Sequence, residues 1–180
     1  MSIFDQKFKD IFSSELISIL SSLIAGTILV TYADKLFLLP GMLILLPGFL
    51  EMRGNISGSF ASRLSAGLFL GIIKTNKVNT KIIKGNLLAS FLLAIVVSLA
   101  LGLIAFLFNY LVLKIFIPKI ILIPLIAGLI ANAIEIPLTL FMTFYLFRKG
   151  HDPNNIMGPF ITSTGDITSI VSLLIVLVII

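Results

Sequence analysis

Apolar runs separated by short polar loops follow one another along the chain and predict five membrane-spanning helices. We place these spans at about residues 16–32, 36–73, 82–110, 120–147 and 155–180. The second run is much longer than the roughly 20 residues that a bilayer crossing requires. We therefore predict a long second helix that is kinked or discontinuous, because the run contains the helix-breaking residues Pro40, Pro47, Gly48, Gly54 and Gly58.

The segment before the first span, residues 1–15, predicts an amphipathic helix at the membrane surface. Its apolar residues recur at helical spacing, and charged residues lie between them. The apolar set is Ile3, Phe4, Phe8, Ile11 and Phe12. We therefore expect residues 1–15 to form an interfacial helix of their own.

The composition excludes a soluble domain. Of the 180 residues, 58% are hydrophobic and 12% are charged, which predicts an all-α integral membrane protein. The chain has no cysteine, and its single His151 excludes a multi-histidine metal site within one chain. Since lysines in the loops of membrane proteins set topology, the net charge of +5 leads us to expect lipid, and not nucleic acid, as a partner.

Charges in the loops predict the orientation of the chain. Eight positive residues lie before the first span or in the loops after the second and fourth spans, and three lie in the other loops. The eight are Lys7, Lys9, Lys74, Lys77, Lys81, Lys84, Arg148 and Lys149, and the three are Lys35, Lys114 and Lys119. Positive loops stay in the cytoplasm, so we expect a cytoplasmic N-terminus and a C-terminus outside the cell membrane.

Small residues recur every four positions on two spans. They are Ser18, Ser22 and Gly26 on the first span, and Ser90, Ala94, Ser98 and Gly102 on the third. Such stripes let helices approach closely in lipid, so we interpret them as packing surfaces.

Polar residues form one stripe along the second span. Glu51, Asn55, Ser59 and Arg63 follow one another at four-residue intervals, which a helix places on one face. Either this face lines a pathway, or the charges of Glu51 and Arg63 only pair and hold helices together. Gly54 allows a local unwinding, which is tolerated at membrane depth where backbone lines a cavity. We therefore predict that the stripe lines a pore.

The fourth span also carries a polar face. Asn132, Glu135 and Thr139 share it, and Pro137 lies among them. Interhelical hydrogen bonding and a functional role explain this cluster equally well. Two arginines of the second span, Arg53 and Arg63, are candidates to pair with Glu135.

The fifth span places a carboxylate near the middle of the membrane. Asp166 lies roughly 16 Å along the helix from Asn155, the start of the span, and a charge at that depth costs at least about 2.5–3.5 kcal/mol. Thr162 and Ser169 share its face, and we expect Gly158-Pro159 to open the helix and free backbone carbonyls. Such oxygens suit hard cations, above all Mg²⁺ that keeps part of its water. A neutral or arginine-paired structural acid is the alternative.

One carboxylate alone is a poor site for a divalent cation. A pore on a two-fold axis receives each ligand twice, so two copies of Asp166 would make a better site. We therefore predict a homodimer around a two-fold pore axis, with Asp166 of both chains near that axis.

Two motifs carry a family resemblance. The first is Gly54-Asn55 followed by Ala61-Ser62-Arg63-Leu64-Ser65, and the second is Asp152-Pro153-Asn154-Asn155 followed by Pro159 and Gly165-Asp166. Together they resemble the hallmarks of MgtE-type magnesium channels and of their relatives, the solute-carrier 41 magnesium transporters. The resemblance covers nearly the whole chain, residues 1–180, as a single transmembrane domain. It implies a dimer with spans two and five lining the path and Asp166 as the central pore acid.

The chain also departs from the family pattern. Ser59 lies near the position where bacterial MgtE has a glutamine, and the cytoplasmic N and CBS domains that gate MgtE are absent from this sequence. The eukaryotic relatives carry two such units in one chain. A dimer with a related half-unit is therefore the alternative to a homodimer. The predicted ion site comprises Asp166, Thr162, Gly165 and Asn55. The predicted pore lining comprises Glu51, Gly54, Ser59, Arg63, Pro159 and Ser169.

These features predict a non-enzymatic divalent cation transporter, with Mg²⁺ as the transported ion and no resident cofactor. Both a channel and a coupled exchanger fit the sequence, and Mn²⁺, Co²⁺ and Zn²⁺ are the competing ions. One alternative is a non-conducting subunit of a larger membrane complex. Another is an intramembrane aspartyl protease, which requires two acids that share a proton, and Asp34 and Glu51 are only distant partners for Asp166.

Overall fold

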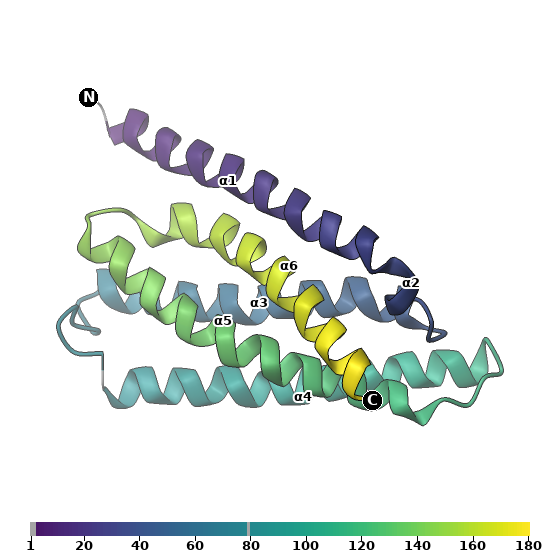
Figure 1. Ribbon diagram of the computed structural model, residues 1–180. Coiled ribbons are helices and arrows are strands. Elements are labelled where there is room, and N and C mark those ends of the chain that lie inside the picture. The colour runs from purple at the N-terminus through teal and green to yellow at the C-terminus, as the bar shows by residue number, and fades with distance from the viewer. Residues whose placement is uncertain (1–2, 79) are drawn as a thin grey trace.

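Helices form every regular element of this computed structural model, which describes residues 3–78 and 80–180. The five long helices are α1 (Ile3–Thr31), α3 (Met42–Phe69), α4 (Lys81–Leu111), α5 (Leu122–Arg148) and α6 (Pro153–Ile179). Two short elements connect them, α2 (Ala33–Leu36) and the 3₁₀ helix η1 (Pro118–Ile121). The helix α6 packs against α1 on one side and against α3 and α5 on the other (Figure 1). The predicted all-α class is confirmed for the described residues.

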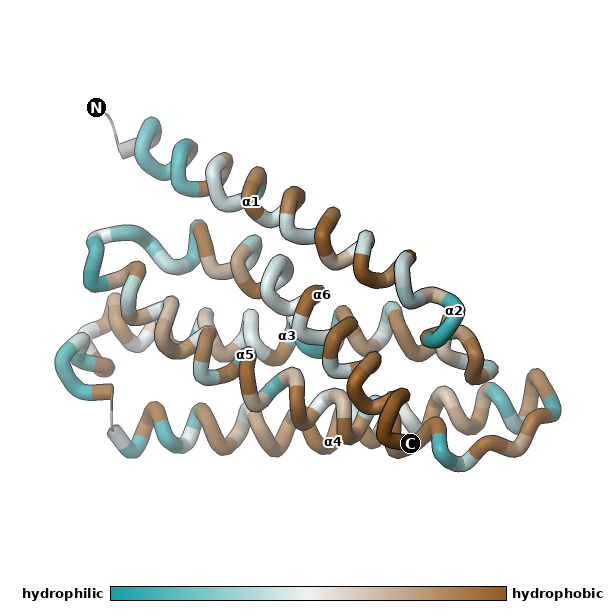
Figure 2. The backbone as a smooth tube through the Cα atoms, viewed as in Figure 1, coloured by the Kyte–Doolittle hydropathy of each residue, from teal (hydrophilic) through white to brown (hydrophobic). Residues whose placement is uncertain are grey.

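Four of the long helices, α1, α4, α5 and α6, are long and apolar enough to cross a membrane. The helix α3 has 28 residues, but Glu51, Arg53 and Arg63 interrupt its apolar sequence. Hydrophilic residues otherwise gather toward the two ends of the bundle, as Figure 2 shows. The chain is therefore a multi-pass membrane protein, and α3 as a fifth crossing stays a prediction.

The predicted surface helix and the first span form one element. The helix α1 runs from Ile3 to Thr31 without a break near residue 15, so the structure differs from the expected separate segment. The physical reason is that neither proline nor glycine occurs before Gly26, so nothing in the sequence ends the helix earlier. Met1 and Ser2, which the predicted segment includes, lie outside the described residues.

The second span is interrupted near its start and not at its centre. The chain leaves helical geometry between α2 and α3, where Gly41 adopts φ +88°. Asn109 of α4 donates a 2.7 Å hydrogen bond from Nδ2 to the Pro40 carbonyl. A Cβ atom at Gly41 would come within 2.3 Å of the Asn109 side chain. Both the positive φ and this close approach require glycine there.

The predicted discontinuity is confirmed at Pro40-Gly41, whereas no break occurs at Gly54 or Gly58, because α3 is helical from Met42 to Phe69. Gly54 and Gly58 keep their N–H groups and so remain in the helical hydrogen-bond ladder, at a cost of about 1 kcal/mol each relative to alanine. Pro47 lies in the second turn, where it removes only one backbone hydrogen bond. The polar face of α3 is therefore a helical face and not an unwound segment.

Small residues bring α4 and α5 together, as their spacing predicted. All four members of the α4 stripe are buried: Ser90, Ala94, Ser98 and Gly102. A Cβ atom at Gly102 would come within 2.5 Å of the Ile121 carbonyl oxygen. A Cβ atom at Gly128 of α5 would come within 2.2 Å of Ser98 Oγ. A larger side chain at Gly102 would displace η1 from α4, and one at Gly128 would require the Ser98 side chain to move.

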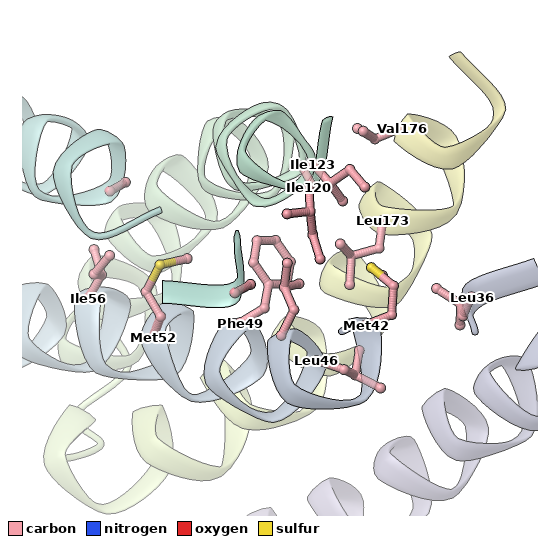
Figure 3. Packing of buried hydrophobic residues seen from close by; sticks show 14 residues of the cluster. Leu36, Met42, Leu46, Phe49, Met52, Ile56, Ile120, Ile123, Leu173 and Val176 are labelled. Carbon is pink, nitrogen blue, oxygen red and sulfur yellow. The ribbon is translucent and has the colours of Figure 1, made fainter. Parts of the chain in front are cut away.

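The largest apolar cluster of the described residues joins α2, α3, α4, η1, α5 and α6 toward the end of the bundle opposite the N-terminus (Figure 3). Phe49 of α3 is fully buried in it, together with Ile120 of η1 and Leu173 of α6. Lipid tails are as apolar as these side chains, so close packing stabilises the cluster more than removal from water does.

The bundle sorts the positive residues by its two ends (Figure 1). The first turns of α1, the α3–α4 loop and the α5–α6 loop lie at one end, and they carry the larger of the two positive groups. Arg148 donates from Nε to the Thr75 carbonyl at 3.0 Å, and His151 Nδ1 lies 3.2 Å from Asp10 Oδ2. The fold therefore supports the grouping of the loops, and the direction of the bundle in the membrane stays a prediction.

Candidate functional site

Asp166 occupies the middle of α6, with thirteen residues of that helix on either side. Its side chain is half-buried and accepts a 3.3 Å hydrogen bond at Oδ2 from Ser22 Oγ of α1. Ser22 belongs to the small-residue stripe of α1, and Ser18 of the same stripe is also buried. The stripe therefore packs α1 against the helix that carries the carboxylate.

The helix α6 stays closed at Gly158-Pro159, in contrast to the expected opening. A proline at 159 leaves the carbonyl of Asn155 without its usual helical donor. Ser14 Oγ of α1 lies 3.4 Å from that oxygen and 2.9 Å from the Ile11 carbonyl of its own helix, so its one hydroxyl proton is shared between two acceptors. The helix therefore stays closed at Pro159, and the Asn155 carbonyl has a long contact with α1.

Exposed polar positions continue from Asp166 toward the start of α6. Asn154, Gly158 and Thr162 are exposed and recur every four residues, so they share a line that leads to Asp166. Thr162 turns its hydroxyl to its own backbone and donates to the Gly158 carbonyl at 3.1 Å. This line borders a cavity of about 190 Å³ between α3 and α6, whose lining includes Gly58 and Ser62.

The predicted stripe on α3 is exposed along its length, since Glu51, Asn55, Ser59 and Arg63 are all solvent-accessible in the single chain. Asn55 donates a 3.0 Å hydrogen bond to Glu51 Oε1. Arg63 turns to α4 and donates to Asn86 Oδ1 at 2.7 Å. Arg63 and Glu51 therefore have different partners, and the idea that these two charges pair is not supported.

A second polar cluster lies inside the bundle, at the depth of Asp166. Arg53 and Glu135 are 1% and 0% exposed, and Arg53 Nη1 lies 3.7 Å from Glu135 Oε2. Arg53 donates from Nε to Ser169 Oγ at 2.5 Å and from Nη1 to Thr168 Oγ1 at 3.1 Å. Thr164 donates a 2.9 Å hydrogen bond to Glu135 Oε1. We call these five residues the Arg53 network.

The Arg53 network corrects several expectations. Ser169, which was expected to line the pore, is fully buried in the network. Gly165 lies against the guanidinium group of Arg53, since a Cβ atom there would come within 2.5 Å of Nη2. Of the polar face on α5, only Glu135 joins the network. Asn132 Nδ2 donates a hydrogen bond to the Gly128 carbonyl of its own helix, which is typical of a polar residue with a structural role.

Sequence reasoning considered Arg53 only as a partner for Glu135 and did not identify Thr164 or Thr168. One signal was available. Arg53 falls between the exposed positions Glu51 and Asn55, so a helix turns it to the opposite side, toward the bundle. A charged residue on that side must have a partner of opposite charge, which the fourth span supplies.

The two polar clusters differ in what they offer a cation. In the Arg53 network one positive and one negative charge neutralise each other. Asp166 has a neutral hydroxyl as its hydrogen-bond partner, and its carboxyl group borders the exposed line. Within the described residues, no three His, Asp or Glu side chains gather closely enough to hold a metal ion. A single chain thus presents one carboxylate, which suits a hydrated cation better than a dehydrated one.

Comparison with known proteins identifies one family. The sequence model described as MgtE, divalent cation transporter, matches residues 46–176. These residues include all of α4 and α5 and most of α3 and α6, and therefore both Asp166 and the Arg53 network. Neither a curated protein nor a solved structure matches the chain.

Proposed function

Because the chain belongs to the MgtE family of divalent cation transporters, we propose that it carries Mg²⁺ across the cell membrane with Asp166 as the central ion-binding acid. The observation that carries this proposal is the position of Asp166. Its carboxylate lies at the midpoint of α6, has no cationic side chain of the described residues within ion-pair distance, and borders a line of exposed polar residues. A carboxylate in a membrane helix is retained where it acts on an ion or a proton.

The exposed polar faces of α3 and α6 support a dimer. Asn55 and Ser59 on α3, and Asn154 and Thr162 on α6, present polar atoms on the outside of a single chain. Lipid cannot hydrogen-bond to such groups, so these faces require water or a protein partner. We infer that two copies meet along these faces around a two-fold axis and enclose the ion path. The axis then brings two Asp166 carboxylates to one site.

The ion in this site keeps most of its water. Mg²⁺ gives up water reluctantly, and the oxygen atoms around Asp166 are too few to replace a full octahedral shell. Carboxylate oxygens of Asp166 therefore accept hydrogen bonds from the water ligands, and selectivity follows the size of the hydrated ion. An inside-negative potential favours inward movement of a doubly charged ion by about 4.6 kcal/mol per 100 mV, which makes passive entry favourable.

Replacement of Asp166 tests this function. In proteoliposomes, Asp166→Asn should lower Mg²⁺ uptake by more than about tenfold, because the charged ligand is lost. Its melting temperature should stay the same or rise slightly, because a charge leaves the membrane interior. Asp34→Asn, at an exposed carboxylate of α2, is the control and should transport normally. Wild-type uptake retained by a well-folded Asp166→Asn protein would end the proposal.

The proposed direction in the membrane has its own test. We expect the end of the bundle with the α3–α4 loop to face the cytoplasm, because it carries most of the positive residues. Since the chain has no cysteine, a single introduced thiol reports its side unambiguously. In intact cells an impermeant thiol reagent should label Leu38→Cys and leave Lys77→Cys unlabelled. The reverse pattern would invert the proposed topology.

A further inference from the structure

The guanidinium group of Arg53 joins three helices at one depth. It extends from α3, lies 3.7 Å from Glu135 of α5, and donates to Thr168 and Ser169 of α6. Thr164 adds a second connection between α6 and Glu135. Hydrogen bonds from a planar arginine fork have fixed directions, so this arrangement specifies rotation as well as distance.

Gly165 allows the guanidinium group to lie directly against α6. A Cβ atom at this position would come within 2.5 Å of Nη2, 2.9 Å of Nη1 and 3.1 Å of Cζ of Arg53. Those three atoms form most of the planar group, so even a methyl group would displace it. Gly165 has helical backbone geometry inside α6, and the need for glycine is therefore steric and specific to Arg53.

Asp166 follows Gly165 and faces another direction. Successive residues of an α-helix differ by about 100° in direction, because a turn contains 3.6 residues. Gly165 faces Arg53 of α3, whereas Asp166 accepts its hydrogen bond from Ser22 of α1. The positive charge of Arg53 also attracts the Asp166 carboxylate from the buried side. The rotation of α6 that seats Arg53 is thus the rotation that places Asp166 beside the exposed line.

We propose that Arg53 is a positioning residue for the ion site: seated on Gly165 and paired with Glu135, it fixes the rotation of α6 and so aims the Asp166 carboxylate at the ion path. This inference rests on the proposed function and adds to it the element that holds the ligand. Asp166 has one hydrogen bond of its own, at 3.3 Å, which is too weak to set its direction. The Arg53 network, which is buried and bonded at several atoms, supplies that direction.

The experiment changes the contact between Gly165 and Arg53 and leaves all charges in place. Gly165→Ala adds one methyl group where Arg53 lies, and Gly85→Ala adds the same group on α4, where nothing lies within 4 Å. Two properties are measured for each: the Mg²⁺ concentration that gives half-maximal thermal stabilisation, and the labelling rate of Thr162→Cys in the same background. Thr162 is exposed on the Asp166 side of α6, so its labelling reports the rotation of that helix.

Gly165→Ala should raise the half-maximal Mg²⁺ concentration by about 10-fold or more, the usual effect of losing a group that orients a metal ligand. It should also change the labelling rate of Thr162→Cys, whereas Gly85→Ala should change neither property. If Gly165→Ala lowers the melting temperature but leaves both properties as in Gly85→Ala, Arg53 is only a structural residue and the inference is overturned.

Arg53→Lys gives a second reading, since it keeps the charge but loses the fork that bonds to Thr168 and Ser169. It should weaken Mg²⁺ stabilisation as Gly165→Ala does. An unchanged Mg²⁺ requirement in a folded Arg53→Lys protein would also contradict the positioning role. A wild-type protein that Mg²⁺ does not stabilise, with Asp166→Asn behaving alike, would instead refute the proposed function itself.

Discussion

Two faces of α6 carry polar residues at the same depth, and the hydrogen-bond partners of these residues differ between the two faces. On the inner face, Thr164, Thr168 and Ser169 bond to Arg53 or Glu135, and the two charges of that network cancel. On the outer face, among the described residues, Thr162 bonds to its own backbone and the Asp166 carboxyl group bonds to the hydroxyl of Ser22.

The difference separates polar residues that are paired inside the bundle from polar residues that lie on its outer face. Inside a membrane, a structural charge requires a countercharge from the protein, and Arg53 has one. Asp166 has no such partner within ion-pair distance among the described residues: its hydrogen bond comes from the neutral hydroxyl of Ser22, and Arg53 attracts it from farther away. For distinguishing structural from functional charges, the number of charges at a given depth is therefore less informative than which countercharge or hydrogen-bond donor each charge has.

The largest loss of stability is expected when one of the two paired charges of the Arg53 network is removed. Arg53→Met should destabilise the protein by about 3–5 kcal/mol, because Glu135 then remains buried without its countercharge. The double variant Arg53→Met/Glu135→Met should recover most of that loss, since both charges are absent. Thermal and denaturant unfolding in mild detergent measure these differences. Equal destabilisation of the single and double variants would show that the two charges do not compensate each other.

A smaller change in stability is expected when one hydroxyl group is removed from each face of α6. Thr164→Val removes a hydroxyl that lies 2.9 Å both from the buried Glu135 Oε1 and from the Phe160 carbonyl of its own helix, and the loss at Glu135 should cost about 1–3 kcal/mol. Thr162→Val removes only a bond to the carbonyl of Gly158 on the same helix and should change stability by less than about 0.5 kcal/mol. The two substitutions have the same volume change, so unfolding measurements compare them directly. Similar losses at both positions would remove the contrast between the faces.

Much of the fold followed from the sequence, because long apolar runs have few alternatives in a membrane. The predicted spans 82–110 and 120–147 lie within about two residues of α4 and α5. The helix starts were less predictable. The span expected to begin near residue 16 continues a helix from Ile3, and the span expected from residue 36 starts as α3 at Met42 after the turn at Gly41. These boundaries depend on contacts such as that of Asn109, which spacing along the chain does not reveal.

Asp166 could be singled out from the sequence because its cost in a membrane is a local property, and its role as an ion ligand stays a prediction. The closed backbone at Pro159 was not predicted, because the Asn155 carbonyl lies near Ser14, which is 141 positions away. The role of Gly165 could not be inferred either, since its motif gives no indication that Arg53 lies against it.

The pairing of α1 with α6 has a consequence for how the protein is made. The main contacts of α1 are with α6, and Ser22 and Asp166, which join them at the site, are 144 positions apart. At common synthesis rates of about 5–20 residues per second, a ribosome needs on the order of 10 s to make the intervening chain. During that interval α1 has no α6 to pack against, and the serines of its small-residue stripe face lipid. The contact between Ser22 and Asp166 therefore forms only after α6 has been made and has entered the membrane.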